Sequence, residues 1–261
     1  MKKINKSSTA NALTHYAHNC RNDSWEHFRG FNHGNDYKTV RRLMLLEQGG
    51  LCAYCEKKID DLAPYLQRVE HFHPKSDISN PSVNWALNWK NVFVVCIGGE
   101  ADGSKHPLPA NLSCDAFKGH LISKGKLSEN CEGFLLNPLD INSPICLFEL
   151  DYATGELKPS KQACSESNYS GPNTYAQFSE LVEETINNLN LNCQRLCDDR
   201  LMVLKHYNQK IVNARKTHNT KIFEQLAQQW LQKPWSSFFT TKRILLKEHA
   251  EYYLQSIGYA G

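Results

Sequence analysis

The sequence contains no apolar run near the roughly 20 residues that a membrane-spanning helix requires. Residues 1–10 are basic and polar, and no hydrophobic stretch follows them, so a secretory leader is not expected. Internal repeats and low-complexity tracts are also lacking. These absences argue against membrane and secreted proteins and predict a cytoplasmic one.

An excess of charge of one sign is lacking as well. The 261 residues include 30 Lys and Arg against 27 Asp and Glu, which gives a net charge of +3. Dedicated nucleic-acid-binding proteins are usually more basic, so the overall charge identifies no partner. The length is sufficient for one large or two small domains with a hydrophobic core.

Cysteine, in contrast, is frequent, with ten residues. Cytoplasmic thiols stay reduced, so these residues favour metal ligation over a disulfide framework. Cys52 and Cys55 are spaced so that two thiolates can bind one tetrahedral zinc ion. Cys96 and Cys114 lie downstream, and the polar, turn-rich insertion between them, residues 97–113, can loop out while its ends approach that ion. The sequence therefore predicts a structural zinc site made of these four cysteines.

Other interpretations of the cysteines remain open. A Cys-x-x-Cys pair also occurs as a redox dithiol, although the βαβ surroundings of such motifs are lacking here. His106, inside the insertion, is a candidate substitute ligand, but solvent exposure is the simpler expectation. Cys193 and Cys197 lie one helical turn apart, which favours small apolar residues on a helix.

Hydrophobic spacing divides the chain into four segments: residues 1–35, 36–130, 131–172 and 173–261. The first is polar and is expected to be loosely ordered. The second begins with a helix and continues as short strands and turns. It has too little apolar sequence for an ordinary core, so a bound metal is expected to supply the missing stability. The third is predicted to form a β-hairpin and a linker, and the fourth to form a helical domain.

Polar residues with catalytic chemistry lie between and beside the cysteines. Glu70 and His71 are predicted to end a strand, where they place a hard metal ligand beside a general base. Asn91 precedes a second strand, and its side chain can brace a loop. Asp115 and Lys118 place a carboxylate and a cation near the predicted start of a helix.

The order of these residues resembles the HNH endonucleases, which have a ββα-metal fold. The resemblance rests on Cys52-x-x-Cys55, Glu70-His71-x-x-Pro74, Asn91 five residues before Cys96, and Cys114-Asp115-x-x-Lys118-Gly119. Within that family, the strings Ala-Tyr-Cys-Glu and Glu-His-Phe-His-Pro-Lys and the trailing helices are similar to PtuB. PtuB is the HNH subunit of Septu antiphage systems and also occurs as an effector beside some retrons. The resemblance implies an α+β fold, with a zinc-stapled ββα-metal module followed by a mainly α-helical domain.

The resemblance also implies a role for each site residue. His71 would be the general base that activates water to attack the scissile phosphate, and Asn91 would brace the loop and orient that base. Glu70 and Asp115 would bind a catalytic Mg²⁺ or Mn²⁺ ion. Asp115 occupies a position that is usually His or Asn in the family, so the ligand geometry departs from the family pattern.

Two accessory residues have less defined roles. His73 is either an extra metal ligand or a residue that hydrogen-bonds nearby backbone, and the second is the expectation. Lys118 is either a phosphate contact or an exposed lysine at the start of a helix.

A phosphodiester-hydrolysing nuclease that acts on DNA or RNA is thus the predicted function. The resemblance implies an ABC-type ATPase subunit, PtuA, as partner, and in a retron also a reverse transcriptase and its single-stranded msDNA. The helices after Tyr175 are expected to dock onto the ATPase through positions such as Leu196, Leu204 and Tyr207. The same helices carry recurring cations that either are solvated or contact phosphate: Arg195, Arg200, Lys205, Lys210, Arg215, Lys216 and Lys221.

The alternative function is a non-catalytic zinc ribbon that binds nucleic acid without cutting it. That reading explains the cysteines, but it gives no use to Glu70, His71, Asn91 and Asp115.

Overall fold

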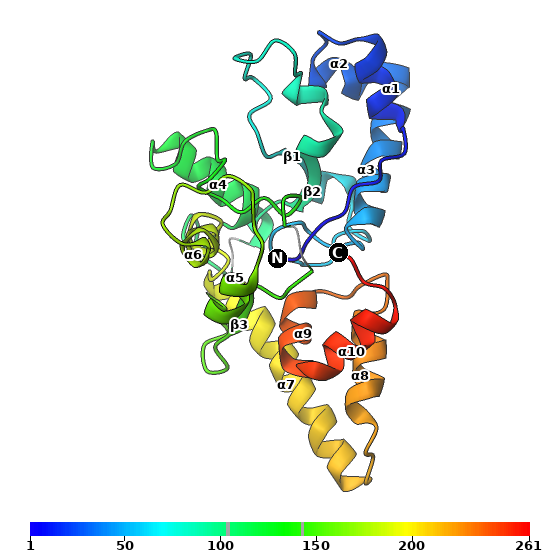
Figure 1. Ribbon diagram of the computed structural model, residues 1–261, viewed down its shortest axis with the longest axis vertical. Coiled ribbons are helices and arrows are strands. Elements are labelled where there is room, and N and C mark those ends of the chain that lie inside the picture. Colours follow the sequence, from blue (N-terminus) through cyan, green and yellow to red (C-terminus); the bar gives the residue numbers. More distant parts are fainter. Residues whose placement is uncertain (103–104, 142–143) are drawn as a thin grey trace.

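The computed structural model describes the whole chain except residues 103–104 and 142–143. Its centre is a two-stranded sheet with helices packed against it (Figure 1). Strand β1 (Gln67–His71) pairs antiparallel with β2 (Val92–Cys96), with His71 opposite Val92. All five residues of β2 are buried, and α4 (Cys114–Ser123) packs against this strand. The fold is α+β, as predicted.

The first 35 residues are folded, contrary to the expectation of a loosely ordered segment. They form α1 (Ala12–Asn19), α2 (Trp25–Gly30) and the 3-10 helix η1 (Phe31–Gly34), which pack against α3 (Asn35–Glu47). The side chain of Ser24 caps α2 by accepting the His27 N–H at 3.1 Å. Buried apolar side chains on these short helices hold the segment in place: Leu13, Tyr16, Trp25 and Phe28.

Short 3-10 helices lie in the loops around the central sheet: η2 (Pro64–Leu66), η3 (Trp85–Leu87), η4 (Trp89–Asn91) and η5 (Glu100–Asp102). Further along the chain, β3 (Phe148–Leu150) and β4 (Leu157–Pro159) pair antiparallel, so the predicted hairpin is confirmed. The stretch predicted as a linker contains a helix, α5 (Lys161–Glu166).

The last third of the chain is helical, as predicted. Its elements are α6 (Phe178–Asn188), α7 (Gln194–Lys216), α8 (Ile222–Leu231), α9 (Phe239–Leu246) and α10 (Glu248–Ser256). Figure 1 shows the far end of α7 and the start of α8 projecting from one end of the molecule. In the described part of the chain, no helix combines the length and apolar character needed to cross a membrane.

The turn between α6 and α7 joins the helices to the central unit. The Cys114 N–H donates to the Leu189 carbonyl at 2.8 Å, and the Asn190 side chain donates to the Ala110 and Leu112 carbonyls, also at 2.8 Å. One connected set of buried apolar side chains extends from the N-terminal helices to α10. The helices therefore hold the loop that leads into α4, and with it the position of Cys114.

Candidate active site

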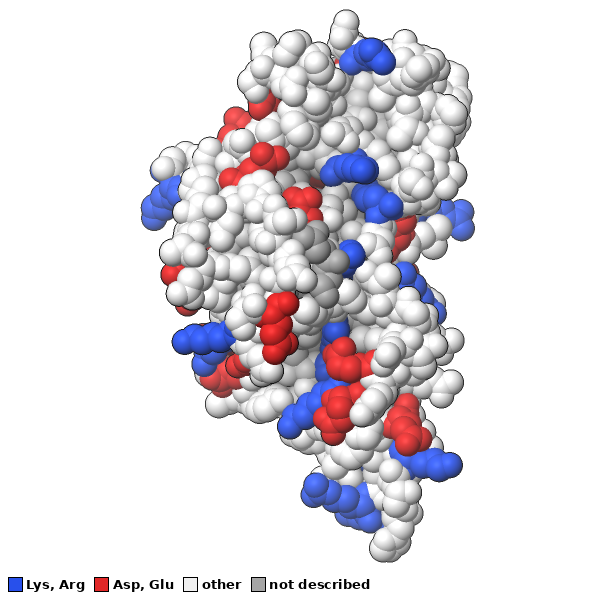
Figure 2. All heavy atoms as spheres, in the orientation of Figure 1, with Lys and Arg blue, Asp and Glu red and all other residues white. Residues whose placement is uncertain are grey.

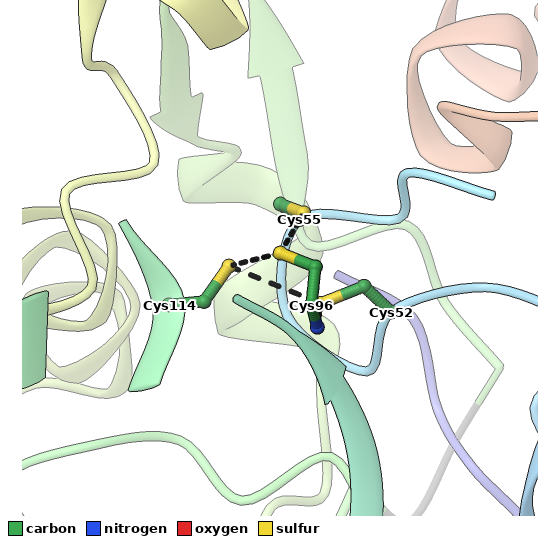
Figure 3. A group of neighbouring side chains, drawn as sticks. All are labelled: Cys52, Cys55, Cys96 and Cys114. Atoms are coloured by element: carbon green, nitrogen blue, oxygen red, sulfur yellow. Dashed lines mark hydrogen bonds between the residues drawn. The ribbon is translucent and has the colours of Figure 1, made fainter. Parts of the chain in front are cut away.

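Four cysteines from separate parts of the chain point toward one another (Figure 3). Cys52 and Cys55 follow α3, Cys96 ends β2, and Cys114 begins α4. Their Sγ atoms are 3.7 Å apart for Cys55 and Cys96, 3.8 Å for Cys96 and Cys114, and 3.9 Å for Cys52 and Cys114. Tetrahedral zinc with Zn–S bonds of ~2.3 Å would place its sulfurs ~3.8 Å apart. The cluster therefore has the dimensions and the donor set of a structural zinc site.

Backbone N–H groups also point at these sulfurs. The Cys96 N–H donates to the Cys52 Sγ at 3.3 Å, and the Gly98 N–H donates to the Cys96 Sγ at 3.4 Å. Burial raises the pKa of the Cys52 and Cys114 thiols, whereas hydrogen bonds with the neighbouring thiols lower the pKa of Cys96. Thiolates this deeply buried are costly without a cation. The burial of the cluster thus supports metal binding.

The insertion between Cys96 and Cys114 closes at its base. The Ser113 N–H donates to the Gly98 carbonyl at 2.9 Å. Gly98 has a φ of +66°, and a Cβ there would lie 2.2 Å from the Ser113 carbonyl oxygen, so only glycine fits. His106, the alternative ligand in this insertion, is half-buried and does not belong to the cluster.

The Glu70 carboxylate lies buried beside α4. Its Oε1 accepts hydrogen bonds from the Lys118 ammonium and, at 3.2 Å, from the Tyr54 hydroxyl. Burial raises the pKa of Glu70, Lys118 opposes this effect, and the nearby Asp115 carboxyl raises the pKa further. Lys118 is only 6% exposed, so the interpretation of an exposed lysine was wrong. Two carboxylates therefore meet here, with a buried cation beside them.

The His71 ring is oriented by two neighbours on the other side of β1. Its Nε2 lies 3.1 Å from the Ala86 carbonyl oxygen, and the Trp25 ring meets it edge-on with 4.6 Å between centroids. Because a carbonyl can only accept, Nε2 carries the proton of the neutral ring and Nδ1 keeps its lone pair. Burial lowers the pKa of His71 to about 4. The ring is therefore neutral near pH 7 and able to accept a proton.

Asn91 ties together the segments around His71. Its side-chain oxygen accepts the His73 N–H at 2.7 Å, and its Nδ2 donates to the carbonyls of His73 and Trp85, both at 2.9 Å. Trp85 directly precedes Ala86, whose carbonyl holds the His71 ring. The amide thus braces the loop that orients His71, and among the residues described it hydrogen-bonds to backbone groups only.

The His73 ring has carboxylate partners instead of the expected backbone partners. Its Nδ1 lies 2.9 Å from Glu132 and its Nε2 lies 2.7 Å from Asp77, while the ring stacks on Trp85 at 3.8 Å between centroids. Both ring nitrogens are thus engaged by carboxylates, and these contacts hold the loop after β1.

Comparison with known proteins agrees with this geometry. No protein-family model matches the chain. It is 34% identical over 249 residues to an Escherichia coli protein named as the HNH endonuclease of retron Ec83, and the alignment covers 95% of each protein. This chain is a member of the HNH endonuclease family.

Two buried residues of this HNH endonuclease reach the site from segments that the sequence did not assign to it. Trp25 comes from the N-terminal helices and packs on His71. Arg195 comes from α7; it donates to the Ser113 hydroxyl at 2.8 Å and packs on Gly99, where a Cβ would lie 2.7 Å from its Nε. A lone tryptophan or arginine carries no spacing signal, so the sequence could not identify them.

The structure also corrects the assignment of the helical surface. Arg195 and Arg200 were predicted on a basic face, but they are 5% and 2% exposed, and Arg200 donates to the Gly155 carbonyl at 2.6 Å. Leu196 was predicted to dock a partner, but it is fully buried in the core. The remaining cations of α7 and of the turn to α8 keep their predicted place on the surface.

Proposed function

We propose that this HNH endonuclease hydrolyses phosphodiester bonds of DNA or RNA, with His71 as general base and with a divalent cation bound by Glu70 and Asp115. The observation that carries this proposal is the state of His71. Its Nε2 is fixed by the Ala86 carbonyl, burial keeps the ring neutral, and its Nδ1 has no hydrogen-bond partner among the residues described.

In the proposed reaction, Nδ1 of His71 takes a proton from water as the water oxygen forms a bond to phosphorus. The phosphorus–oxygen bond to the leaving group breaks, and the leaving oxygen is protonated from solvent. Asn91 fixes the loop that carries Ala86, and Trp25 restricts the ring to one orientation. A properly placed general base contributes typically ~10²–10⁴-fold to the rate.

The residues beside α4 fit a hard divalent cation by their donor chemistry. Mg²⁺ is usually held by one or two carboxylates, with water and substrate phosphate as its other ligands. Glu70 and Asp115 supply two such groups, and Glu70 is buried without enough positive charge to hold its pKa at its ordinary value. A bound Mg²⁺ or Mn²⁺ would supply stabilisation of the charge that develops on the phosphate.

Lys118 provides positive charge beside Glu70 in this structure. Its contact with a proposed metal ligand means that a divalent ion must compete with the ammonium for the same carboxylate. We assign Lys118 the role of limiting metal affinity before the substrate arrives, and of offering a second positive charge to the phosphate once the metal is bound.

The proposed zinc ion is structural. Sulfur from Cys52, Cys55, Cys96 and Cys114 would fill all the positions of a tetrahedral ion, which leaves none for substrate. Its proposed role is to fasten the turn after α3 to the end of β2 and the start of α4, the same elements that present the catalytic residues.

The E. coli relative supports a proposal about cellular role, because its name places that protein in a retron. We assign this chain a role as the nuclease effector of an antiphage defence complex, with an ABC-type ATPase as partner and a retron reverse transcriptase and its msDNA as further components. The test is co-purification of the full-length chain with these proteins after co-expression. Failure of the ATPase to co-purify under conditions that retain the reverse transcriptase would contradict the proposed partner.

Cleavage assays test the proposed chemistry. Plasmid DNA and structured RNA should be cut in Mg²⁺ or Mn²⁺, by the assembled complex if the chain alone is restrained, and EDTA treatment should abolish cleavage. Full activity after EDTA treatment would contradict the catalytic metal. Binding without cleavage in every metal would favour the zinc-ribbon alternative.

A further inference from the structure

The far end of α7 and the turn to α8 form a basic arm, residues 201–223. These residues contain Lys205, Lys210, Arg215, Lys216 and Lys221 and no Asp or Glu. The rest of the chain has 25 basic residues against 27 acidic ones, so the arm accounts for the whole positive net charge. Positive charge is thus concentrated in one projecting element, although the overall charge of +3 looks unremarkable. Figure 2 shows Lys and Arg side chains at this narrow end of the molecule.

The cations of the arm have no acidic partners. Within the part of the chain that the structure describes, none of the five takes part in an ion pair, whereas other cations do, such as Lys57 with Asp199 at 3.0 Å and Arg243 with Glu251 at 2.6 Å. Four of the five are exposed and Lys210 is half-buried. Cations that project without partners retain their full charge for an external anion.

One face of the arm also has the hydrogen-bonding groups and shape of a backbone-binding surface. A shallow groove of ≈ 730 Å³ runs along α7 and is lined by Lys205, Asn208, Gln209 and Asn213 together with apolar side chains. Lysine and amide side chains are common donors to phosphate and sugar oxygens. No acidic group lines this groove.

The carboxylates of the active site make a remote cationic anchor useful. Lys118 is ion-paired with Glu70, and Arg68 is ion-paired with Glu100 and lies 4.0 Å from Asp115, so the cations at the site are already matched by carboxylates. A nuclease substrate held only there would bind weakly. Electrostatic attraction by cations away from the site raises the affinity for nucleic acid without changing the reaction itself.

From these observations we propose that the arm binds the phosphate backbone of a nucleic acid whose other part enters the active site. This rests on the proposed nucleic-acid substrate but not on the roles of His71 or the metal. Arg195 lies beside the Cys114 loop, and a helix rises ~1.5 Å per residue, so Lys216 lies about 30 Å further along α7. A duplex that reaches from this loop to Lys216 therefore covers about 9 base pairs at ~3.4 Å each.

The test measures binding by the full-length protein with no divalent cation added, so that cleavage does not interfere. Fluorescence anisotropy follows a labelled duplex of about 24 base pairs and one of about 6, over a range of salt concentrations. The arm variant carries Lys205→Gln, Arg215→Gln and Lys216→Gln. The matched control carries Lys124→Gln, Lys126→Gln and Lys161→Gln, three exposed cations outside the arm that form no ion pair with any residue the structure describes.

The arm variant should bind the long duplex at least about 10-fold more weakly at low salt. The slope of log K against log salt should become shallower by about 2–3, since each lost phosphate contact contributes ~0.9. The control should match the wild-type protein with both duplexes, and the short duplex, which cannot reach the arm and the active site together, should bind the wild-type protein more weakly than the long duplex does. Circular dichroism should report the same unfolding temperature for all of them.

Equal affinity and equal salt slopes for the arm variant and the control would overturn the proposal, as would a wild-type protein that binds no nucleic acid. Loss of the ATPase from the arm variant with unchanged nucleic-acid binding would assign the arm to a protein interface instead. If the protein binds nucleic acid through the arm but cuts no substrate, this inference stands and the proposed chemistry is contradicted.

Discussion

Replacing Cys52 with serine should unfold the central unit of the protein. The Cys52 thiol is 1% exposed and accepts the Cys96 N–H, and the next residue, Ala53, donates its N–H to the Val94 carbonyl at 3.1 Å. The substitution would leave three sulfurs for a site built for four. Structural zinc contributes about 10–16 kcal/mol of apparent folding free energy in small zinc domains, against about 5–15 kcal/mol of total stability for a typical protein. Even partial loss of zinc affinity is therefore comparable with the whole stability.

The assay combines elemental analysis of the purified protein with thermal unfolding followed by circular dichroism. Wild-type protein should contain one zinc per chain, and Cys52→Ser should aggregate or unfold without zinc. Cys20→Ser is the matched control, since Cys20 lies on the N-terminal helices outside the cluster and should retain zinc and stability. Active wild-type protein with less than half an equivalent of zinc would refute the reasoning, and so would a Cys52→Ser variant with the wild-type unfolding temperature.

Further substitutions test the other contacts of the site. Glu70→Gln and Asp115→Asn should raise the metal concentration needed for half-maximal cleavage, and excess Mn²⁺ should partly restore activity; unchanged metal dependence would exclude them as ligands. Lys118→Met should tighten Mn²⁺ binding, measured by electron paramagnetic resonance, while it slows cleavage; weaker binding would contradict the proposed competition. Asn91→Ala removes three hydrogen bonds, two of them fully buried, so unfolding free energy should fall by about 3 kcal/mol and cleavage should slow; a change in stability alone would separate Asn91 from the orientation of His71. Trp25→Ala should lower the stability by about 3–5 kcal/mol and reduce cleavage beyond what partial unfolding explains; wild-type activity in the folded fraction would remove Trp25 from the site.

The parts of the site that share short spacing could be predicted from the sequence. Cys52 and Cys55 are separated by two residues, and Glu70 and His71 are adjacent, so local geometry alone places them together. The convergence of Cys96 and Cys114 on the first pair was also predictable, because the insertion between them is polar and closes through glycine. The two strands of the central sheet and the helix α4 also follow in the predicted order.

Contacts between distant segments could not be predicted in this way. The N-terminal helices are mostly polar, and the apolar side chains that turn inward are sparse (Leu13, Tyr16, Trp25 and Phe28), so a periodicity argument misses them. Arg195 and Arg200 resemble any other helical cations in the sequence, but each is buried against carbonyl or hydroxyl groups brought in by other elements. The pairing of Lys118 with Glu70 depends on how α4 lies against the sheet, which the spacing of neither residue reveals.

The measurement that tests the central claim most directly compares His71→Ala with the wild-type protein for nuclease activity, zinc content and unfolding temperature. If His71 is the general base, cleavage should fall by about 10²–10⁴-fold, while zinc content stays at one per chain and the protein remains folded. His18→Ala provides the matched control, because His18 lies on α1 outside the site and its loss should leave cleavage unchanged. Wild-type cleavage rates in the folded His71→Ala variant would contradict the account, and loss of zinc in that variant would make His71 a structural residue instead.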